Sequence, residues 1–161
     1  MGDPNEQATT LGPMANIKFA NNVRDQLKDA IEKGAKPLID TKEVFPNDKA
    51  ETAYVAPQIL VNVNHDMLVM TEETFGPVLG IMKVSSDQEA IDLMNDSKYG
   101  LTASIWTSSE EKAIEIGDQI ETGTWFMNRC DYIDPALAWV GAKDSGLGFS
   151  MSKQGYSQFT R

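Results

Sequence analysis

The stretch from Val78 to Asn128 constrains the fold of this chain most, because strand-like and helix-like segments alternate along it. The sequence predicts three strands, at Val78–Val84, Leu101–Thr107 and Gly123–Asn128. An amphipathic segment that predicts a helix separates each strand from the next. Strand, helix, strand, helix, strand at this spacing indicates two crossover connections and a parallel sheet. The predicted fold class is therefore α/β.

Two sequence signatures place the starts of these helices. Ser86 and Glu89 have the spacing of a capping box, in which a hydroxyl and a carboxylate satisfy backbone N–H groups of the first turn. Ser108 and Glu111 repeat that spacing before the second helix. We therefore expect each helix to begin at its serine.

A further helix is predicted near the N-terminus. Apolar residues recur at helical spacing from Met14 to Ile31. Pro13 is expected in the first turn, where a missing N–H costs nothing, and Gly34 is expected as the C-terminal cap.

The segment that follows predicts a short strand, a loop and an extended stretch. The strand is expected at Lys36–Asp40, and Thr41–Thr52 is expected to be a polar loop. Tyr54–Val63 is predicted to be extended, although Pro57 argues against a central strand at that point.

The charge balance excludes several kinds of partner. The chain has 24 acidic and 14 basic side chains, a formal net charge of -10. This charge repels phosphate backbones, so we expect neither nucleic acid nor an anionic membrane as a partner. No apolar run approaches the roughly 20 residues of a membrane helix.

The single cysteine and the single histidine limit which disulfide and metal sites the chain can form. Cys130 is the only cysteine, which rules out an intrachain disulfide and makes the reducing cytoplasm the expected location. His65 is the only histidine and has no second ligand near it in the sequence, so no metal site is predicted.

The loop Glu72–Pro77, with the sequence Glu-Glu-Thr-Phe-Gly-Pro, is the candidate binding segment. Gly76 can adopt backbone angles closed to other residues, and Pro77 fixes its own φ, so the loop shape is restrained. A carboxylate accepts hydrogen bonds from sugar hydroxyls and an aromatic ring packs against a heterocycle, which suits a hydroxylated, planar ligand. On these residues alone, a solvated acidic turn with Phe75 in the core is the simpler interpretation.

The wider sequence resembles the aldehyde dehydrogenase superfamily. The matching motifs are the opening Gly-Asp-Pro with Thr9–Met14, then Glu72–Leu79, Asn95–Thr107 and Gly141–Gly148. They match the last third or so of such an enzyme. The resemblance implies that residues 1–161 are the C-terminal part of its catalytic domain, without a complete dinucleotide-binding domain. It also implies an incomplete three-layer αβα architecture with a mostly parallel sheet.

The same resemblance implies a cofactor and a reaction. Aldehyde dehydrogenases oxidise an aldehyde, the small-molecule partner expected here, to a carboxylic acid with NAD or NADP. In that family the motif matched by residues 72–77 holds the nicotinamide half of the cofactor. Carried over, Glu73 would accept hydrogen bonds from the nicotinamide ribose, and Phe75 would pack beside the ring.

Four other residues take roles from the resemblance. Trp139 falls where the family has an aromatic residue lining the aldehyde tunnel, with a core tryptophan as the alternative. Asn128 resembles a position that supports the active-site floor. Gly76 and Pro77 would shape the cofactor loop.

No catalytic residue is assigned within the chain. The family's nucleophilic cysteine, base glutamate and adenine-binding half lie upstream, as do the residues that separate NAD from NADP. Cys130 lies in Met-Asn-Arg-Cys-Asp, not in the family's Gly-Gln-x-Cys setting. Arg129 would lower the pKa of its thiol and Asp131 would raise it, so no activation follows. We expect a buried or semi-buried thiol.

Two functional hypotheses remain open. Either the chain is part of a dehydrogenase and is inactive by itself, or it is a non-catalytic α/β binding or assembly module derived from the family. We also expect a homo-oligomer. The sheet is expected to have an uncovered edge, and the family segment after Phe159 and Thr160 leads into a strand that joins a neighbouring subunit.

Overall fold

The computed structural model of the chain describes residues 1–130 and 132–160. It contains two compact units, Met1–Lys83 and Val84–Arg161. Each unit contains a pair of parallel strands connected through a helix, so the predicted α/β class is confirmed. Within the described part of the chain, no helix has the length and apolar character needed to cross a lipid bilayer.

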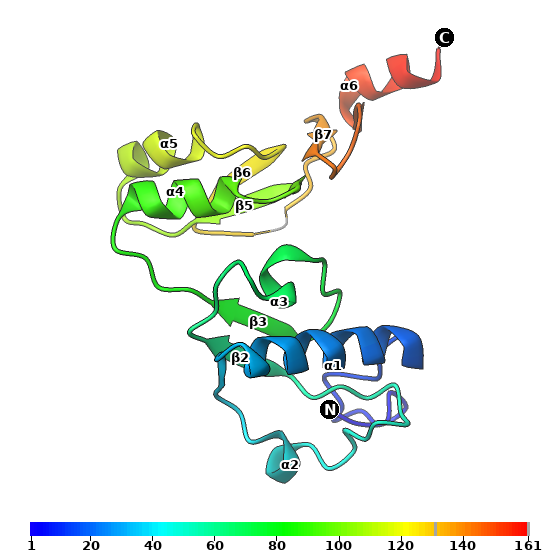
Figure 1. The fold of residues 1–161 in the computed structure, drawn as a ribbon. Coiled ribbons are helices and arrows are strands. Elements are labelled where there is room, and N and C mark those ends of the chain that lie inside the picture. The colour runs from blue at the N-terminus through cyan, green and yellow to red at the C-terminus, as the bar shows by residue number, and fades with distance from the viewer. Residues whose placement is uncertain (131, 161) are drawn as a thin grey trace. The chain divides into compact units, whose positions relative to one another are not determined.

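The first unit is a three-stranded sheet with helices packed against it (Figure 1). Its strands are β1 (Lys36–Pro37), β2 (Gln58–Val61) and β3 (Val78–Ile81), in the order β1-β2-β3. β1 is antiparallel to β2, whereas β2 is parallel to β3, with Gln58 opposite Val78. The long helix is α1 (Ile17–Glu32), and the one-turn helix α3 (Leu68–Thr71) lies in the crossover from β2 to β3.

The strands β1 and β2 are shorter than the sequence predicts, and β1 covers only Lys36–Pro37 of the predicted Lys36–Asp40. Only four residues of the extended stretch form strand β2, which begins directly after Pro57, a residue with no N–H for a sheet ladder. The predicted polar loop contains a one-turn helix, α2 (Thr41–Val44). The Asp40 carboxylate caps this helix by accepting a hydrogen bond from the Lys42 N–H at 3.2 Å.

The ends of α1 are set by a side-chain cap at its start and a glycine turn at its end. The helix begins after Asn16, whose side-chain oxygen accepts a hydrogen bond from the Phe19 N–H at 3.0 Å. The expected start near Pro13 is therefore wrong, because Asn16 supplies the better cap. At the other end Gly34 has a φ of 103°, and the Ala35 N–H donates to the Ala30 carbonyl, so the predicted glycine cap is confirmed.

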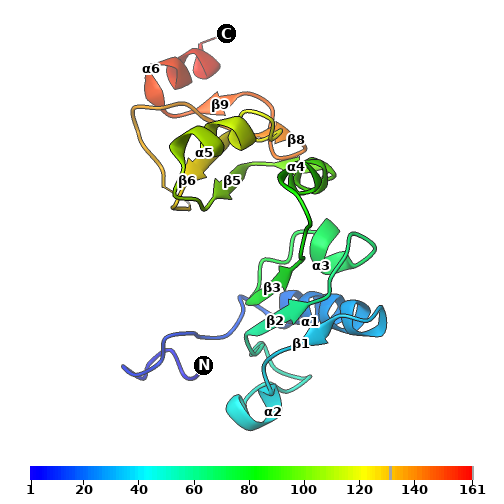
Figure 2. The ribbon, with the colours of Figure 1, turned by 90° about the vertical axis from the view of Figure 1, so that its left-hand side faces the viewer.

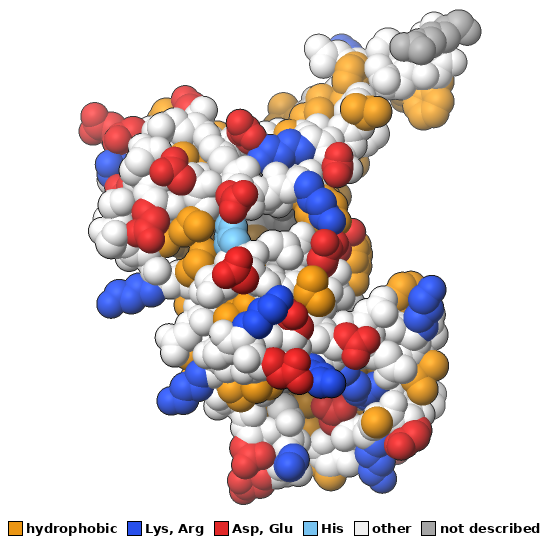
Figure 3. Space-filling model, viewed as in Figure 1, with side chains coloured by type: hydrophobic (Ala, Val, Ile, Leu, Met, Phe, Trp, Pro, Cys, Tyr) orange, Lys and Arg blue, Asp and Glu red, His pale blue; other side chains and the backbone are white. Residues whose placement is uncertain are grey.

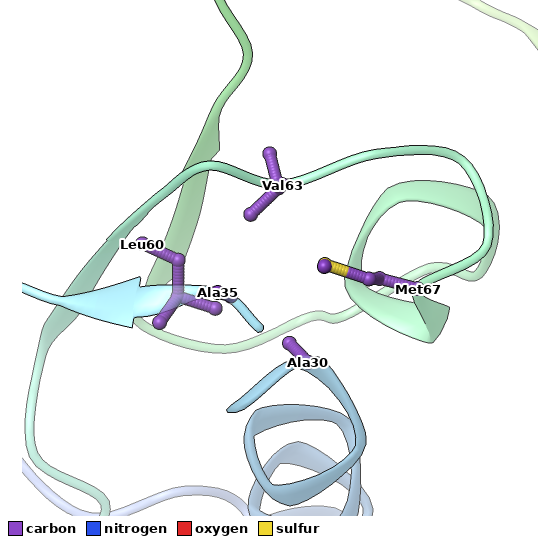
Figure 4. Packing of buried hydrophobic residues seen from close by; sticks show 5 residues of the cluster. All are labelled: Ala30, Ala35, Leu60, Val63 and Met67. Carbon is purple, nitrogen blue, oxygen red and sulfur yellow. The ribbon is translucent and has the colours of Figure 1, made fainter. Parts of the chain in front are cut away.

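The core of the first unit lies between α1, the sheet and α3. Side chains from these elements converge in Figure 4, where Leu60 of β2 is fully buried and Met67, just before α3, is 1% exposed. Ala30 of α1 faces them without a larger side chain, which lets the helix approach closely. This core fixes α3 and the loop that follows it against α1.

The second unit holds a parallel pair and two small antiparallel pairs. After α4 (Asp87–Asn95) come β5 (Thr102–Ile105), α5 (Glu110–Gly117) and β6 (Thr124–Met127), and α5 packs on the β5–β6 pair (Figure 2). β4 (Tyr99–Gly100) pairs with β8 (Ala142–Lys143), and β7 (Trp139–Val140) pairs with β9 (Phe149–Ser150). The unit closes with α6 (Ser152–Gly155) and a 3-10 turn over Tyr156–Phe159.

The two helix starts agree with the sequence to different degrees. Ser86 caps α4 by accepting from the Glu89 N–H at 3.1 Å, while the Glu89 carboxylate accepts from the Ser85 N–H at 2.7 Å. At α5 the cap is Ser109, which accepts from the Lys112 N–H, so the predicted start at Ser108 is wrong by one residue. The third helical residue is then a lysine, which has no carboxylate to complete the box.

The single parallel sheet expected across residues 78–128 is not what the described residues form. β3 pairs with β2, and β5 pairs only with β6. The sequence order of strands and helices is right, but the partner of β3 comes from upstream. A shorter crossover through α3 joins β2 to β3, and local patterning carries no information about that choice.

Acidic and basic side chains are interspersed with apolar ones on the face drawn in Figure 3. On that face, acidic side chains lie over both units.

Candidate functional site

A pocket of about 840 Å³ lies between α1 and the loop that follows α3. Its lining comes entirely from the first unit: Met14, Ala15, Phe19, Asn22, Asp25, Gln26, Leu68, Glu72, Glu73, Thr74 and Phe75. Its size falls in the range of small-molecule binding clefts, roughly 300–1,000 Å³. We call it the α1–loop pocket.

The loop that forms one wall is held by a buried side chain of α1. Gln26 is only 8% exposed, and its Nε2 donates to the Glu73 carbonyl at 3.3 Å. The Thr74 hydroxyl donates to Gln26 Oε1 at 2.8 Å. The backbone of Glu73 is thereby tied to the helix, while its side chain remains exposed at the pocket.

Phe75 projects from the loop on a strained backbone. Its φ is 43°, a left-handed angle that is uncommon for an aromatic residue, and its side chain is 80% exposed. The interpretation that placed Phe75 in the core is therefore wrong. An exposed ring on a strained backbone is a typical sign of a ligand-contacting position.

Gly76 is required for a different reason from the one the sequence suggests. Its φ is not in the left-handed region, so conformational freedom does not explain it. A Cβ at this position would lie 2.5 Å from Val23 Cγ2, inside van der Waals contact. The close approach of the loop to α1 therefore requires glycine.

Backbone hydrogen bonds connect the loop to the sheet. The Pro77 carbonyl accepts from the Gln58 N–H at 2.9 Å, at the start of β2. The Val78 N–H donates to the Gly76 carbonyl at 2.8 Å. The loop therefore enters β3 in a defined position.

The start of α3 is held by a carboxylate from α1. Asp29 Oδ2 accepts from the Leu68 N–H at 2.8 Å, and Asp29 Oδ1 pairs with Lys33 Nζ at 2.7 Å. The Lys33 ammonium and the Leu68 N–H both hold the pKa of Asp29 below its ordinary value. Met67 makes no side-chain cap of its own, so this bond replaces one.

The lining defines what the pocket suits chemically. Three of its residues carry carboxylates, Asp25, Glu72 and Glu73, and none of the lining side chains is Lys, Arg or His. Carboxylates accept hydrogen bonds and favour nearby positive charge, and they repel phosphate. The exposed Phe75 ring adds an apolar face. The pocket suits a hydroxylated ligand with a flat, neutral or cationic ring.

The other predicted site residues lie in the second unit. Trp139 is half-buried in β7, opposite Ser150 of β9. Asn128 follows β6 with a φ of 52°. Its side chain accepts from the Thr107 N–H at 2.9 Å and donates to the Thr107 carbonyl at 2.7 Å, joining the ends of β5 and β6.

Cys130 has a different environment from the one expected. Its side chain is exposed, so the prediction of a buried or semi-buried thiol is wrong. The neighbouring Arg129 guanidinium lies 3.9 Å from the centre of the Tyr132 ring in a cation–π contact. Asp131, expected to act on the thiol, lies outside the described residues.

Comparison with known proteins identifies the family. The model of the aldehyde dehydrogenase family matches residues 1–161. The chain belongs to the aldehyde dehydrogenase family. It is 40% identical over 158 residues to an aldehyde dehydrogenase of Paenarthrobacter nicotinovorans, covering 98% of this chain and 34% of that protein. It is 33% identical to an Escherichia coli succinate semialdehyde dehydrogenase [NAD(P)+], covering 99% of this chain and 34% of that protein.

A solved member of the aldehyde dehydrogenase family has the same fold. The crystal structure of Mycobacterium tuberculosis aldehyde dehydrogenase complexed with NAD+ matches with a TM-score of 0.87 and 33% identity. That match covers 98% of this chain and 32% of the solved one. The chain thus spans about a third of the length of these family members.

The α1 wall of the pocket was not predicted from the sequence. Phe19, Asn22 and Gln26 recur at helical spacing on one face of α1, and all three line the pocket. That spacing was visible in the sequence. A face of mixed apolar and amide residues does not by itself indicate a binding wall, because only the packing of the loop makes it one.

Proposed function

We propose that this chain is the C-terminal part of the catalytic domain of an NAD(P)-dependent aldehyde dehydrogenase, and that it holds the nicotinamide end of the cofactor. One observation carries the proposal. Glu73 and Phe75, the two residues that match the family's nicotinamide motif, both line the α1–loop pocket.

The residues present fit that end of the cofactor. Glu73 offers carboxylate oxygens for the ribose hydroxyls, and Phe75 offers an exposed ring face for the nicotinamide. The oxidised nicotinamide ring is cationic, and the three carboxylates of the lining favour positive charge. The same lining would disfavour a phosphate, so the pyrophosphate is expected to bind elsewhere.

When bound, the cofactor supplies a hydride acceptor for aldehyde oxidation. The residues of this chain act by positioning. Glu73 fixes the ribose, Phe75 limits the tilt of the ring, and the rigid turn at Gly76 and Pro77 keeps both side chains in place. Trp139 would give the aldehyde tunnel a flat apolar wall, and Asn128 would hold the end of β6 to the end of β5.

Exposed apolar side chains support the view that the chain works within a larger protein. On β3, Leu79 is 58% exposed and Ile81 is 46% exposed, although parallel sheets are normally covered on both faces. Trp106, just after β5, is 69% exposed. In the proposed enzyme the rest of the polypeptide covers these faces. Its nucleophilic cysteine, base glutamate and adenine-binding half also lie outside the matched third. The proposed location is the cytoplasm.

Glu73→Gln and Phe75→Ala in the complete dehydrogenase test the proposal. Both changes are expected to slow hydride transfer in single-turnover experiments on the order of tenfold to a hundredfold, because a misplaced ring loses reactive geometry. Overall cofactor affinity is expected to change less, since most of it comes from the adenine and pyrophosphate ends. Unchanged hydride rates in both variants would mean that the loop has only a structural role.

The 161-residue chain by itself is expected to show no aldehyde-dependent NADH formation. The measurement uses high protein concentration and several aldehydes, with a buffer blank. Turnover above the blank that disappears in Cys130→Ser would contradict the proposal and assign the nucleophile to the exposed thiol. Both hypotheses expect the isolated chain to be inactive. Detection of the 161-residue chain in cells as an independent polypeptide would therefore favour the alternative, a non-catalytic family module.

A further inference from the structure

We propose that Gln26 is a positioning residue for the nicotinamide, acting through the backbone of Glu73 and the hydroxyl of Thr74. The inference rests on the proposed function of Glu73 and Phe75. It adds a residue that lies outside the matched loop motif and on another element of the fold.

Three side chains of α1 contact, one after another, the segment that runs from α3 into the loop. Val23 packs against Gly76, Gln26 bonds to Glu73 and Thr74, and Asp29 bonds to Leu68. These helix positions are three residues apart and therefore lie along one stripe of α1. The stripe runs antiparallel to residues 68–76 and fixes that segment at its start, its middle and its end.

Gln26 occupies the middle of this stripe, next to the two residues proposed to touch the cofactor. A buried amide must bond its polar atoms, and Gln26 uses one donor and one acceptor on the loop. Both partners precede Phe75 directly. A rotation of the Glu73–Thr74 peptide would redirect the Glu73 carboxylate and the Phe75 ring together. Gln26 therefore fixes the orientation of both side chains.

The structure also contains a matched control for burial. Gln58 is 7% exposed in the same unit, but its side chain bonds to Leu38, Ile39 and Ile59, away from the loop. Only its backbone N–H, which a substitution retains, bonds to the loop at Pro77. Replacing either glutamine by leucine removes one buried amide and puts an apolar side chain of similar size in its place. Only the Gln26 change removes side-chain hydrogen bonds to the cofactor loop.

Amide exchange in the 161-residue chain tests the geometry without any cofactor. In Gln26→Leu, the Glu72 and Val78 N–H groups that bracket the loop are expected to exchange about tenfold faster. The Gly34 and Ala35 N–H groups at the end of α1 should keep their rates. Thr74→Val should act in the same direction, and the double variant should add little to either single change. Gln58→Leu should leave the exchange rate of the Glu72 N–H unchanged; the Val78 N–H is not compared in this variant, because Val78 lies opposite Gln58 in the β2–β3 pair.

Kinetics in the complete dehydrogenase test the function. Gln26→Leu is expected to lower the single-turnover hydride rate on the order of tenfold, with the aldehyde KM unchanged. Gln58→Leu is expected to lower thermal stability without this rate effect. Normal hydride transfer in Gln26→Leu, alongside slow transfer in Glu73→Gln, would overturn the inference and leave the proposed function intact. Normal transfer in Glu73→Gln and Phe75→Ala would overturn the proposed function itself.

Discussion

The backbone of Gly76 packs against the fully buried side chain of Val23, leaving no space for a Cβ at position 76. The contact is on the inner side of the proposed cofactor loop. It joins the stability of the first unit to the shape of the α1–loop pocket, because α1 provides both the core residue and the pocket wall.

Gly76→Ala is therefore expected to lower the free energy of unfolding by about 1 to 3 kcal/mol, the usual cost of overpacking. Urea denaturation of the chain measures this loss. Gly12→Ala is the control, because the nearest atom to its added Cβ is 3.8 Å away. Combining Gly76→Ala with Val23→Ala should recover part of the loss. Equal stability of Gly76→Ala and Gly12→Ala would show that the loop moves freely away from α1.

Capping of α3 by Asp29 is expected to depend on pH. Lys33 and the Leu68 N–H lower the folded-state pKa of Asp29. The stabilisation of α3 by the ionised Asp29 carboxylate is therefore fully present above the unfolded-state pKa, about 3.9. It is lost as the pH falls through the lower folded-state pKa. Protection of the Leu68 amide, corrected for intrinsic exchange, should persist at the unfolded-state pKa of about 3.9 and decline only as the pH falls further. Asp29→Asn should show weaker protection with no such titration, and a midpoint at or above the ordinary carboxyl value would contradict the assignment.

Asn128 is expected to hold the ends of β5 and β6 together. Asn128→Gly keeps the left-handed backbone but loses both bonds to Thr107, and should destabilise the second unit by about 0.5 to 1 kcal/mol. Asn128→Ala should cost about 1 kcal/mol more, because a Cβ disfavours a φ of 52°. Urea denaturation gives the difference, and exchange of the Thr107 N–H localises it. Identical stability of the two variants would mean that the backbone relaxes.

The chain is expected to self-associate in solution. Strand β3 is at the end of the order β1-β2-β3, and its exposed Leu79 and Ile81 accompany an unpaired edge. Light scattering after size exclusion, at micromolar concentration, should give a dimer or larger species in spite of the net charge of -10. Leu79→Lys should shift the population toward monomer. A sharp monomer peak for the unmodified chain, with a cooperative melt, would contradict the prediction.

The sequence by itself determined the features that depend on residues close together along the chain. Ser86 as a helix cap and Gly34 as a helix end follow from the spacing of a few residues, because caps and turns are made by neighbours. The α/β class follows from the alternation of strand-like and helix-like segments along the chain. The resemblance of Glu72–Leu79 and the other motifs also indicated the family that the comparisons show.

Only the tertiary structure decided the features that join distant segments. The partner of β3 is β2, Phe75 faces solvent, and Gly76 is required by Val23, which lies 53 positions earlier. Gln26 contacts residues almost as far away. No local pattern contains such contacts, because they arise when the buried stripe of α1 packs on the core and selects which face meets the loop. The α1–loop pocket is a product of that packing, whereas the two residues proposed to use it were readable in the sequence.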